Sequence, residues 1–113
     1  MADDLDRTLA ALADPTRRGI VELLREGPRN PSEIAEALDV SRPVMSRHLR
    51  VLRSAGMVSE TIQSDDARVR MYQLHPEPFE QLTGWLDELD AFWSDQLQAF
   101  KAHAEAPRKK RTR

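Results

Sequence analysis

The chain has 113 residues, of which 40% are hydrophobic and 32% are charged, and this balance predicts one globular domain rather than a disordered chain. The absence of cysteine excludes disulfides and thiolate metal sites. The sequence has no apolar run of the roughly 18 residues that a membrane span needs, and its acidic start lacks the apolar core of a signal peptide. We therefore expect a cytoplasmic protein without a membrane partner.

Apolar residues at helical spacing predict two helices at the start of the chain. The first helix covers about residues 5–13. Its leucines, at i, i+4 and i+7, are Leu5, Leu9 and Leu12. We expect Asp14 to cap a second helix over about residues 16–25, because an aspartate side chain accepts hydrogen bonds from the unpaired amides of a first turn.

Two further helices flank a short turn in the middle of the chain. The third helix covers residues 31–38, and residues 39–41 form the turn. Ser41 is expected to cap the fourth helix, and Gly56 to end it. The buried stripe of this fourth helix consists of Met45, Leu49 and Leu52.

A hairpin and a long helix complete the predicted fold. Residues 57–62 and 68–74 have the composition of two strands, and residues 63–67 are a polar turn between them. After a proline-rich break at residues 75–78, the last helix covers about residues 79–104.

This order of four helices, two strands and a final helix predicts a mainly α fold with a small β-hairpin, the winged helix-turn-helix. The folded domain covers residues 1–104, and residues 105–113 form a basic disordered tail. The last helix is longer than so small a domain can cover, so its apolar stripe predicts a homodimer. The expected interface residues are Leu5, Leu9, Leu12, Leu82, Trp85, Leu86, Leu89, Phe92, Trp93, Leu97 and Phe100. The aromatic residues among them have a second interpretation, as the lining of a small-molecule pocket between subunits.

The fourth helix carries residues suited to binding double-stranded DNA. Four arginines and no acid lie between Ser41 and Ser54, although the net charge of the whole chain is only −2. The second helix of such a unit enters the major groove, where arginine reads guanine through a bidentate fork. We assign Arg42, Ser46 and Arg47 to base readout, and Arg50 and His48 to phosphate contacts.

Two simpler interpretations stay open, since arginines on a helix are often a solvated face and a histidine beside Leu49 is often partly buried. In the hairpin, Arg68 and Arg70 are expected to reach DNA, although Asp65 and Asp66 at the tip repel phosphates. The predicted DNA-binding residues are therefore Ser41, Arg42, Pro43, Ser46, Arg47, His48, Arg50, Arg68 and Arg70.

Three segments of the chain resemble the ArsR/SmtB family of bacterial repressors. They are ADPTRR at residues 13–18, IAEAL at residues 34–38 and SRPVMSRHLRVLRSAGMV at residues 41–58. The resemblance covers residues 5–75 and implies a winged helix fold and a homodimer through the first and last helices. It also implies a palindromic operator that the protein releases when it senses a signal.

Founding members of that family sense metals, and the residues that bind those metals are missing here. Asn30 and Ser32 stand near the positions of the two cysteines of the third-helix site. The last helix has only His103 for the site that pairs aspartate with histidine across two copies, and its aspartates are not at matching spacings. We therefore expect a non-metal-sensing branch, with no metal and no cofactor.

The predicted function is a DNA-binding transcriptional regulator, a repressor that acts as a homodimer, with a small-molecule or protein effector possible. An enzyme is not expected, because the sequence contains no glycine-rich phosphate loop and suggests no Ser-His-Asp arrangement. The alternative is a winged helix that only binds other proteins, since a fold alone does not determine function. The arginines of the fourth helix argue against that alternative.

Overall fold

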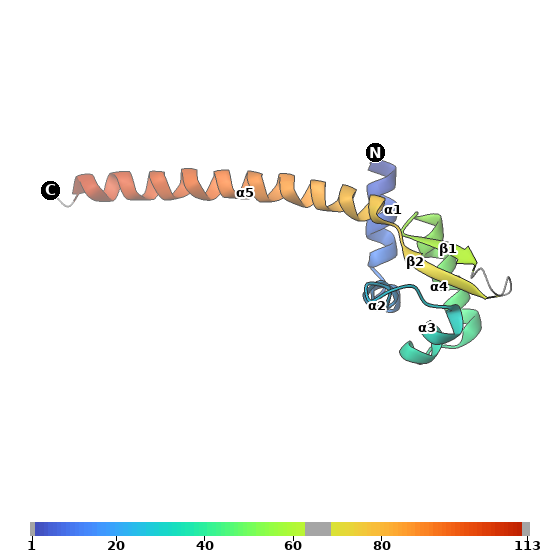
Figure 1. The fold of residues 1–113 in the computed structure, drawn as a ribbon. Helices are drawn as coiled ribbons and strands as arrows, with labels where there is room; N and C mark the ends of the chain where they lie inside the picture. The colour runs from blue at the N-terminus through green and yellow to red at the C-terminus, as the bar shows by residue number, and fades with distance from the viewer. Residues whose placement is uncertain (1, 63–68, 112–113) are drawn as a thin grey trace. The chain divides into compact units, whose positions relative to one another are not determined.

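The computed structural model describes residues 2–62 and 69–111 (Figure 1). The chain divides into two compact units, Met1–Leu82 and Thr83–Arg113. The elements in chain order are α1 (Ala2–Leu12), α2 (Pro15–Leu24), α3 (Pro31–Leu38), α4 (Arg42–Ser54), β1 (Val58–Ile62), β2 (Arg70–Leu74) and α5 (Pro76–Arg111). This is the predicted order of elements, so the mainly α fold with a small hairpin is confirmed.

Polar side chains at the first turns determine where the central helices begin. Asp14 caps α2, as predicted, and its Oδ1 accepts the backbone N–H of Thr16 at 2.8 Å and that of Arg17 at 3.1 Å. Ser41 caps α4 through the N–H of Val44. The cap of α3 was not predicted: Asn30 and Glu33 form a reciprocal capping box, whose N-x-x-E spacing is visible in the sequence.

The turn between α3 and α4 sets the crossing of the two helices. Asp39 ends α3 in the left-handed conformation, with φ of 54°, which aspartate tolerates better than most residues. Val40 then packs against the core, and its N–H donates to the carbonyl of Ala35 at 3.0 Å. The short turn therefore directs α4 across α3, as a helix-turn-helix requires.

The strands pair antiparallel, with Val58 opposite Leu74 and Ile62 opposite Arg70. Both strands begin slightly later than predicted, and the hairpin is fastened to the loop before α3. There Arg29 exchanges two backbone hydrogen bonds with Tyr72, of 3.0 and 2.7 Å. A two-stranded hairpin is only marginally stable by itself. This contact therefore anchors the β1–β2 hairpin, which is the wing of the fold, to the helices.

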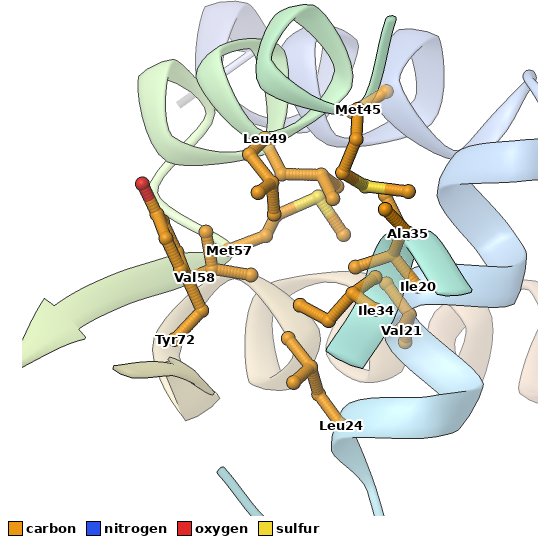
Figure 2. Packing of buried hydrophobic residues seen from close by; sticks show 12 residues of the cluster. Ile20, Val21, Leu24, Ile34, Ala35, Met45, Leu49, Met57, Val58 and Tyr72 are labelled. Atoms are coloured by element: carbon orange, nitrogen blue, oxygen red, sulfur yellow. The ribbon is translucent and has the colours of Figure 1, made fainter. Parts of the chain in front are cut away.

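One apolar cluster joins the four helices and the hairpin of the first unit. Figure 2 shows Leu49 and Met45 of α4 pointing toward Ile20 of α2 and Ile34 of α3. The predicted stripe of α4 is buried, with Met45 and Leu52 at 0% exposure. Burying side chains of this size contributes roughly 1.5–3 kcal/mol each, so the orientation of α4 is firmly set by its apolar face.

The last helix is longer at both ends than the sequence indicates. It begins at Pro76 rather than near residue 79, because a proline at the first helical position loses no hydrogen bond. Its backbone continues to Arg111, past the expected end at Ala104. Residues 105–111 are therefore helical, whereas the sequence predicts a disordered tail there. Lysine and arginine are good helix formers, and positive charge suits a helix C-terminus. The division of the chain at residue 105 stays a prediction.

None of the helices in residues 2–62 and 69–111 combines the length and hydropathy that crossing a membrane requires.

Candidate nucleic-acid interface

The face of α4 opposite its buried stripe is exposed and basic. Successive residues of a helix are rotated by about 100°, so Pro43, Arg47 and Arg50 point away from the core. Arg42 and Ser46 lie on the flank between this face and the stripe. The predicted residues that the structure leaves exposed on α4 and at its cap are Ser41, Arg42, Pro43, Ser46, Arg47 and Arg50.

Arg42 is held against α3 at the start of α4. Its Nη1 donates to the Oγ of Ser32 at 2.8 Å. Both side chains are exposed, and a guanidinium has five N–H donors, so Arg42 keeps donors for a further partner. Ser32 thus orients an arginine, a role that its place in the sequence does not indicate.

His48 faces the other flank of α4 and is half-buried. Its Nδ1 lies 3.2 Å from Nη1 of Arg17, whose Nε donates to the carbonyl of Ala11 at 2.7 Å. Arg17 therefore links the end of α1 to α4. This contact supports the structural interpretation of His48 that the sequence left open, and a phosphate contact by His48 stays a prediction.

The Asp14 cap lies beside this contact. Hydrogen bonding from the backbone N–H of Arg17 lowers the pKa of the Asp14 carboxyl below its ordinary value of 3.8, and the backbone N–H of Thr16 and the charges of His48 and Arg17 act in the same direction. Burial opposes this lowering. The carboxylate that caps α2 is therefore charged at neutral pH.

Glu60 of β1 joins the wing to the recognition helix, a role that was not predicted. Its Oε1 lies 3.2 Å from Nη1 of Arg53 on α4, and its Oε2 lies 3.2 Å from Nη1 of Arg70 on β2. The Glu60 side chain is only 15% exposed, whereas the two arginines are 58% and 64% exposed. One partly buried carboxylate thus holds two exposed guanidinium groups, one on α4 and one on β2.

Tyr72 lies behind that carboxylate. Its hydroxyl donates to Oε2 of Glu60 at 3.5 Å, and burial raises the pKa of the phenol, with the charge of Glu60 adding to the effect. Of the predicted wing residues, Arg70 is exposed on β2, whereas Arg68, Asp65 and Asp66 lie outside the described residues.

Comparison with known proteins identifies the family. Residues 14–60 match the model of the bacterial regulatory protein, arsR family. The HTH-type transcriptional regulator Rv2034 of Mycobacterium tuberculosis is 42% identical over 95 residues, which cover 84% of this chain and 83% of that protein. The chain belongs to the ArsR family. The resemblance stated from the sequence is therefore confirmed, and the family is one of transcriptional regulators, not of enzymes.

Other ArsR-type relatives agree with the fold. The transcriptional repressor SdpR of Bacillus subtilis is 38% identical over 56 residues, covering 50% of this chain and 62% of that protein. The structure of an ArsR-like regulator from Rhodococcus sp. RHA1 matches with a TM-score of 0.77 at 29% identity, over 92% of this chain and 93% of that one. The structure of the homodimeric winged helix-turn-helix domain of Mb0332 from Mycobacterium bovis matches with a TM-score of 0.64 at 26% identity. The match covers 80% of this chain and 81% of that one. The winged helix-turn-helix fold is confirmed.

Asn30 and Ser32, which the resemblance places near the cysteines of the third-helix metal site, make other contacts here. Asn30 caps α3, and Ser32 accepts from Arg42. Within residues 2–62 and 69–111 no three His, Cys, Asp or Glu residues are grouped closely enough to hold a metal ion.

The predicted dimer residues of this ArsR chain differ in exposure. Leu9 is 40% exposed, whereas Leu5 is half-buried and Leu12 packs against the core of its own subunit. Leu82 is half-buried in the first unit. The remaining predicted residues are at least 36% exposed: Trp85, Leu86, Leu89, Phe92, Trp93, Leu97 and Phe100. Phe92 and Trp93 form an edge-to-face pair with ring centroids 5.4 Å apart.

Proposed function

We propose that this ArsR protein is a homodimeric transcriptional repressor that binds a palindromic operator with one α4 in the major groove of each half-site. The observation that carries the proposal is the basic, acid-free outer face of α4, which the buried stripe beneath it holds in a fixed orientation. A groove about 12 Å wide admits such a helix.

The residues of α4 take different roles in this proposal. Arg47 points furthest from the core and reads a base edge, together with Arg42 and Ser46 on the flank. Arg50 contacts a phosphate and sets the orientation of the helix on the duplex. Ser41 and Pro43, at the first turn, allow the helix N-terminus to approach the backbone, because its free amides favour negative charge.

The wing adds contacts that do not depend on base sequence. Arg70 is exposed on β2 and reaches the DNA backbone or minor groove beside α4. Arg68 is proposed for the same role from the sequence alone. Glu60 reduces the positive potential at this point, because its carboxylate is shared by Arg53 and Arg70.

Dimerisation explains the exposed apolar residues of α5. Seven large apolar side chains between Trp85 and Phe100 are exposed in the single chain, which is a larger apolar stripe than an isolated soluble helix carries. We propose that a second copy covers them, with help from Leu9 of α1. Two recognition helices then lie about one DNA turn apart, roughly 34 Å, and the complex acts on the chromosome in the bacterial cytoplasm.

The test is a binding measurement with the full chain on duplexes recovered by genome-wide selection with purified protein. We expect the best duplex to be pseudo-palindromic and to bind at least about a thousandfold tighter than a scrambled duplex of the same composition, the lower end for specific regulators. A winged helix that serves only as a protein-interaction module would bind both duplexes equally weakly, and that result would refute the proposal.

A further inference from the structure

A groove between α1 and α4 shares only Arg50 with the proposed DNA contacts. It has a volume of about 330 Å³ and lies entirely within the first unit. Arg7, Ala10 and Ala11 line it from α1, Arg17 from α2, and Arg50 and Val51 from α4. The volume is at the lower end of the range for small-molecule sites, about 300–1,000 Å³.

The charges of this groove are all of one sign. Three guanidinium groups and no carboxylate line it. Arg7 and Arg50 form no hydrogen bond or ion pair with any described residue, so both are free to bind an anion. Arg17 is fixed by its bonds to Ala10, Ala11 and His48, and a guanidinium with five N–H groups retains donors beyond these.

The rest of the groove's lining is mostly apolar. Ala10, Ala11 and Val51 contribute to it, and Val51 is 39% exposed, so an apolar group can reach it. A DNA phosphate gains nothing from apolar side chains, because its surroundings in the duplex are hydrated. A groove that combines apolar side chains with arginines instead matches a ligand that has an apolar body and one anionic group.

We propose that this groove binds a small organic carboxylate with an apolar chain, and that its binding releases the repressor from DNA. The second part rests on the proposed function. A carboxylate in the groove draws Arg50 away from the phosphate that it contacts in the DNA complex. It also binds Arg17, the residue that connects α1 to α4. Ligand and operator therefore weaken each other's binding, and this coupling is reciprocal.

The direct test is calorimetric titration of the full chain with octanoate, with acetate and 1-octanol as controls. Octanoate carries both the carboxylate and the apolar chain, whereas each control lacks one of them. We expect octanoate to bind at least about tenfold tighter than either control, at one site per chain. Equal binding of octanoate and 1-octanol, or no binding of octanoate at millimolar concentration, would overturn the proposal.

The Arg7→Gln variant tests the groove without altering a proposed DNA contact, because Arg7 lines the groove but is not among the DNA-binding residues. We expect this variant to weaken octanoate binding about tenfold. Its operator affinity without octanoate should stay within twofold of the wild type. Arg25→Gln, which removes an exposed arginine directly after α2 and outside the groove, is the matched control and should change neither measurement.

The operator measurement distinguishes the possible failures. Octanoate should weaken operator binding of the wild type by at least about fivefold, the lower end of common coupling factors, and that of Arg7→Gln much less. If Arg7→Gln instead weakens operator binding without octanoate and lowers its salt dependence, the groove is a phosphate contact and the proposal is wrong. If the chain binds no operator, the proposed function fails, while the calorimetry still decides whether the groove binds the carboxylate.

Discussion

At the scale of single residues, the exposed guanidinium groups near α4 differ in how they are held. Arg42 is attached to Ser32, and Arg53 and Arg70 share Glu60, whereas Arg47 and Arg50 have no partner among the described residues. A guanidinium with a protein partner is preorganised but gives up part of its interaction when DNA replaces that partner. If the hairpin contacts DNA as proposed, Glu60 reduces how strongly Arg53 and Arg70 attract phosphates.

Replacement of Glu60 by glutamine tests that role. We expect Glu60→Gln to tighten binding to nonspecific duplex and to steepen its salt dependence, because Arg53 and Arg70 lose their carboxylate. The stability of the fold should fall by only about 1 kcal/mol, since the pairs are largely exposed on the arginine side. Anisotropy titrations at several salt concentrations measure the first effect, and weaker nonspecific binding would contradict the interpretation.

The Arg70→Ala variant tests whether the wing contacts DNA. Each phosphate contact that is lost lowers the slope of log affinity against log salt by about one unit. We expect that change for Arg70→Ala, with equal losses for operator and scrambled duplexes because a backbone contact carries no sequence information. Arg25→Ala provides the matched control. An unaltered slope would remove the wing from the interface.

At the scale of elements, the caps of the helices determine how the recognition helix is presented. Asp14 fixes the start of α2, and through Arg17 the same turn contacts α1 and α4. The pKa of Asp14 is lowered in the folded chain. Its stabilising effect is therefore complete above the unfolded pKa, near 3.8, and is lost as the pH falls below that value through the lower folded pKa.

Asp14→Ala should consequently lower the unfolding midpoint at neutral pH. The difference from the wild type should shrink below about pH 4, where the wild-type carboxylate becomes protonated. Asp14→Asn is the control, since asparagine also caps helices but does not titrate in this range. Denaturant unfolding from pH 2 to pH 7 measures the stability of both variants and of the wild type. If the difference between wild type and Asp14→Ala grew on acidification, the charged Asp14 cap would not be the source of the stability.

Local chemistry explains which parts of the fold could be predicted. The stripe of α4 and its Ser41 cap follow from spacing and residue type, so the position of the recognition helix was predictable. The start of α5 was missed because prolines 76 and 78 were interpreted as a break, although a first helical turn accepts proline. The contacts of Arg17 with His48 and of Glu60 with Arg53 and Arg70 depend on how distant elements pack, and no spacing in the sequence indicates them.

At the scale of the whole molecule, dimerisation should depend on the exposed apolar residues of α5. Leu97 is 65% exposed, so its replacement costs the single chain little. We expect Leu97→Glu to convert the dimer to monomer at micromolar concentration, because it places a charge in an apolar interface. Gln98→Glu adds the same charge at the neighbouring position and should leave the dimer intact. Sedimentation would contradict the interface if both variants stayed dimeric.

Operator binding should fall together with dimerisation. A single α4 reads one half-site, so the monomeric Leu97→Glu variant loses the second set of contacts and the effective concentration that links them. The basic face of α4 is unaltered in this variant, and nonspecific binding per chain should persist. The proposal therefore assigns the length of the recognised site to the dimer and the choice of bases to α4.

The most direct test of sequence reading by α4 is a comparison of the base preferences of the wild type and Arg47→Ala on a panel of operators, each with one base pair replaced. We expect Arg47→Ala to lose about 1–3 kcal/mol of discrimination at one position in each half-site, related by the operator's symmetry, and to keep its other preferences. An unaltered preference profile, or a uniform loss at every position, would show that the outer face of α4 does not read the bases.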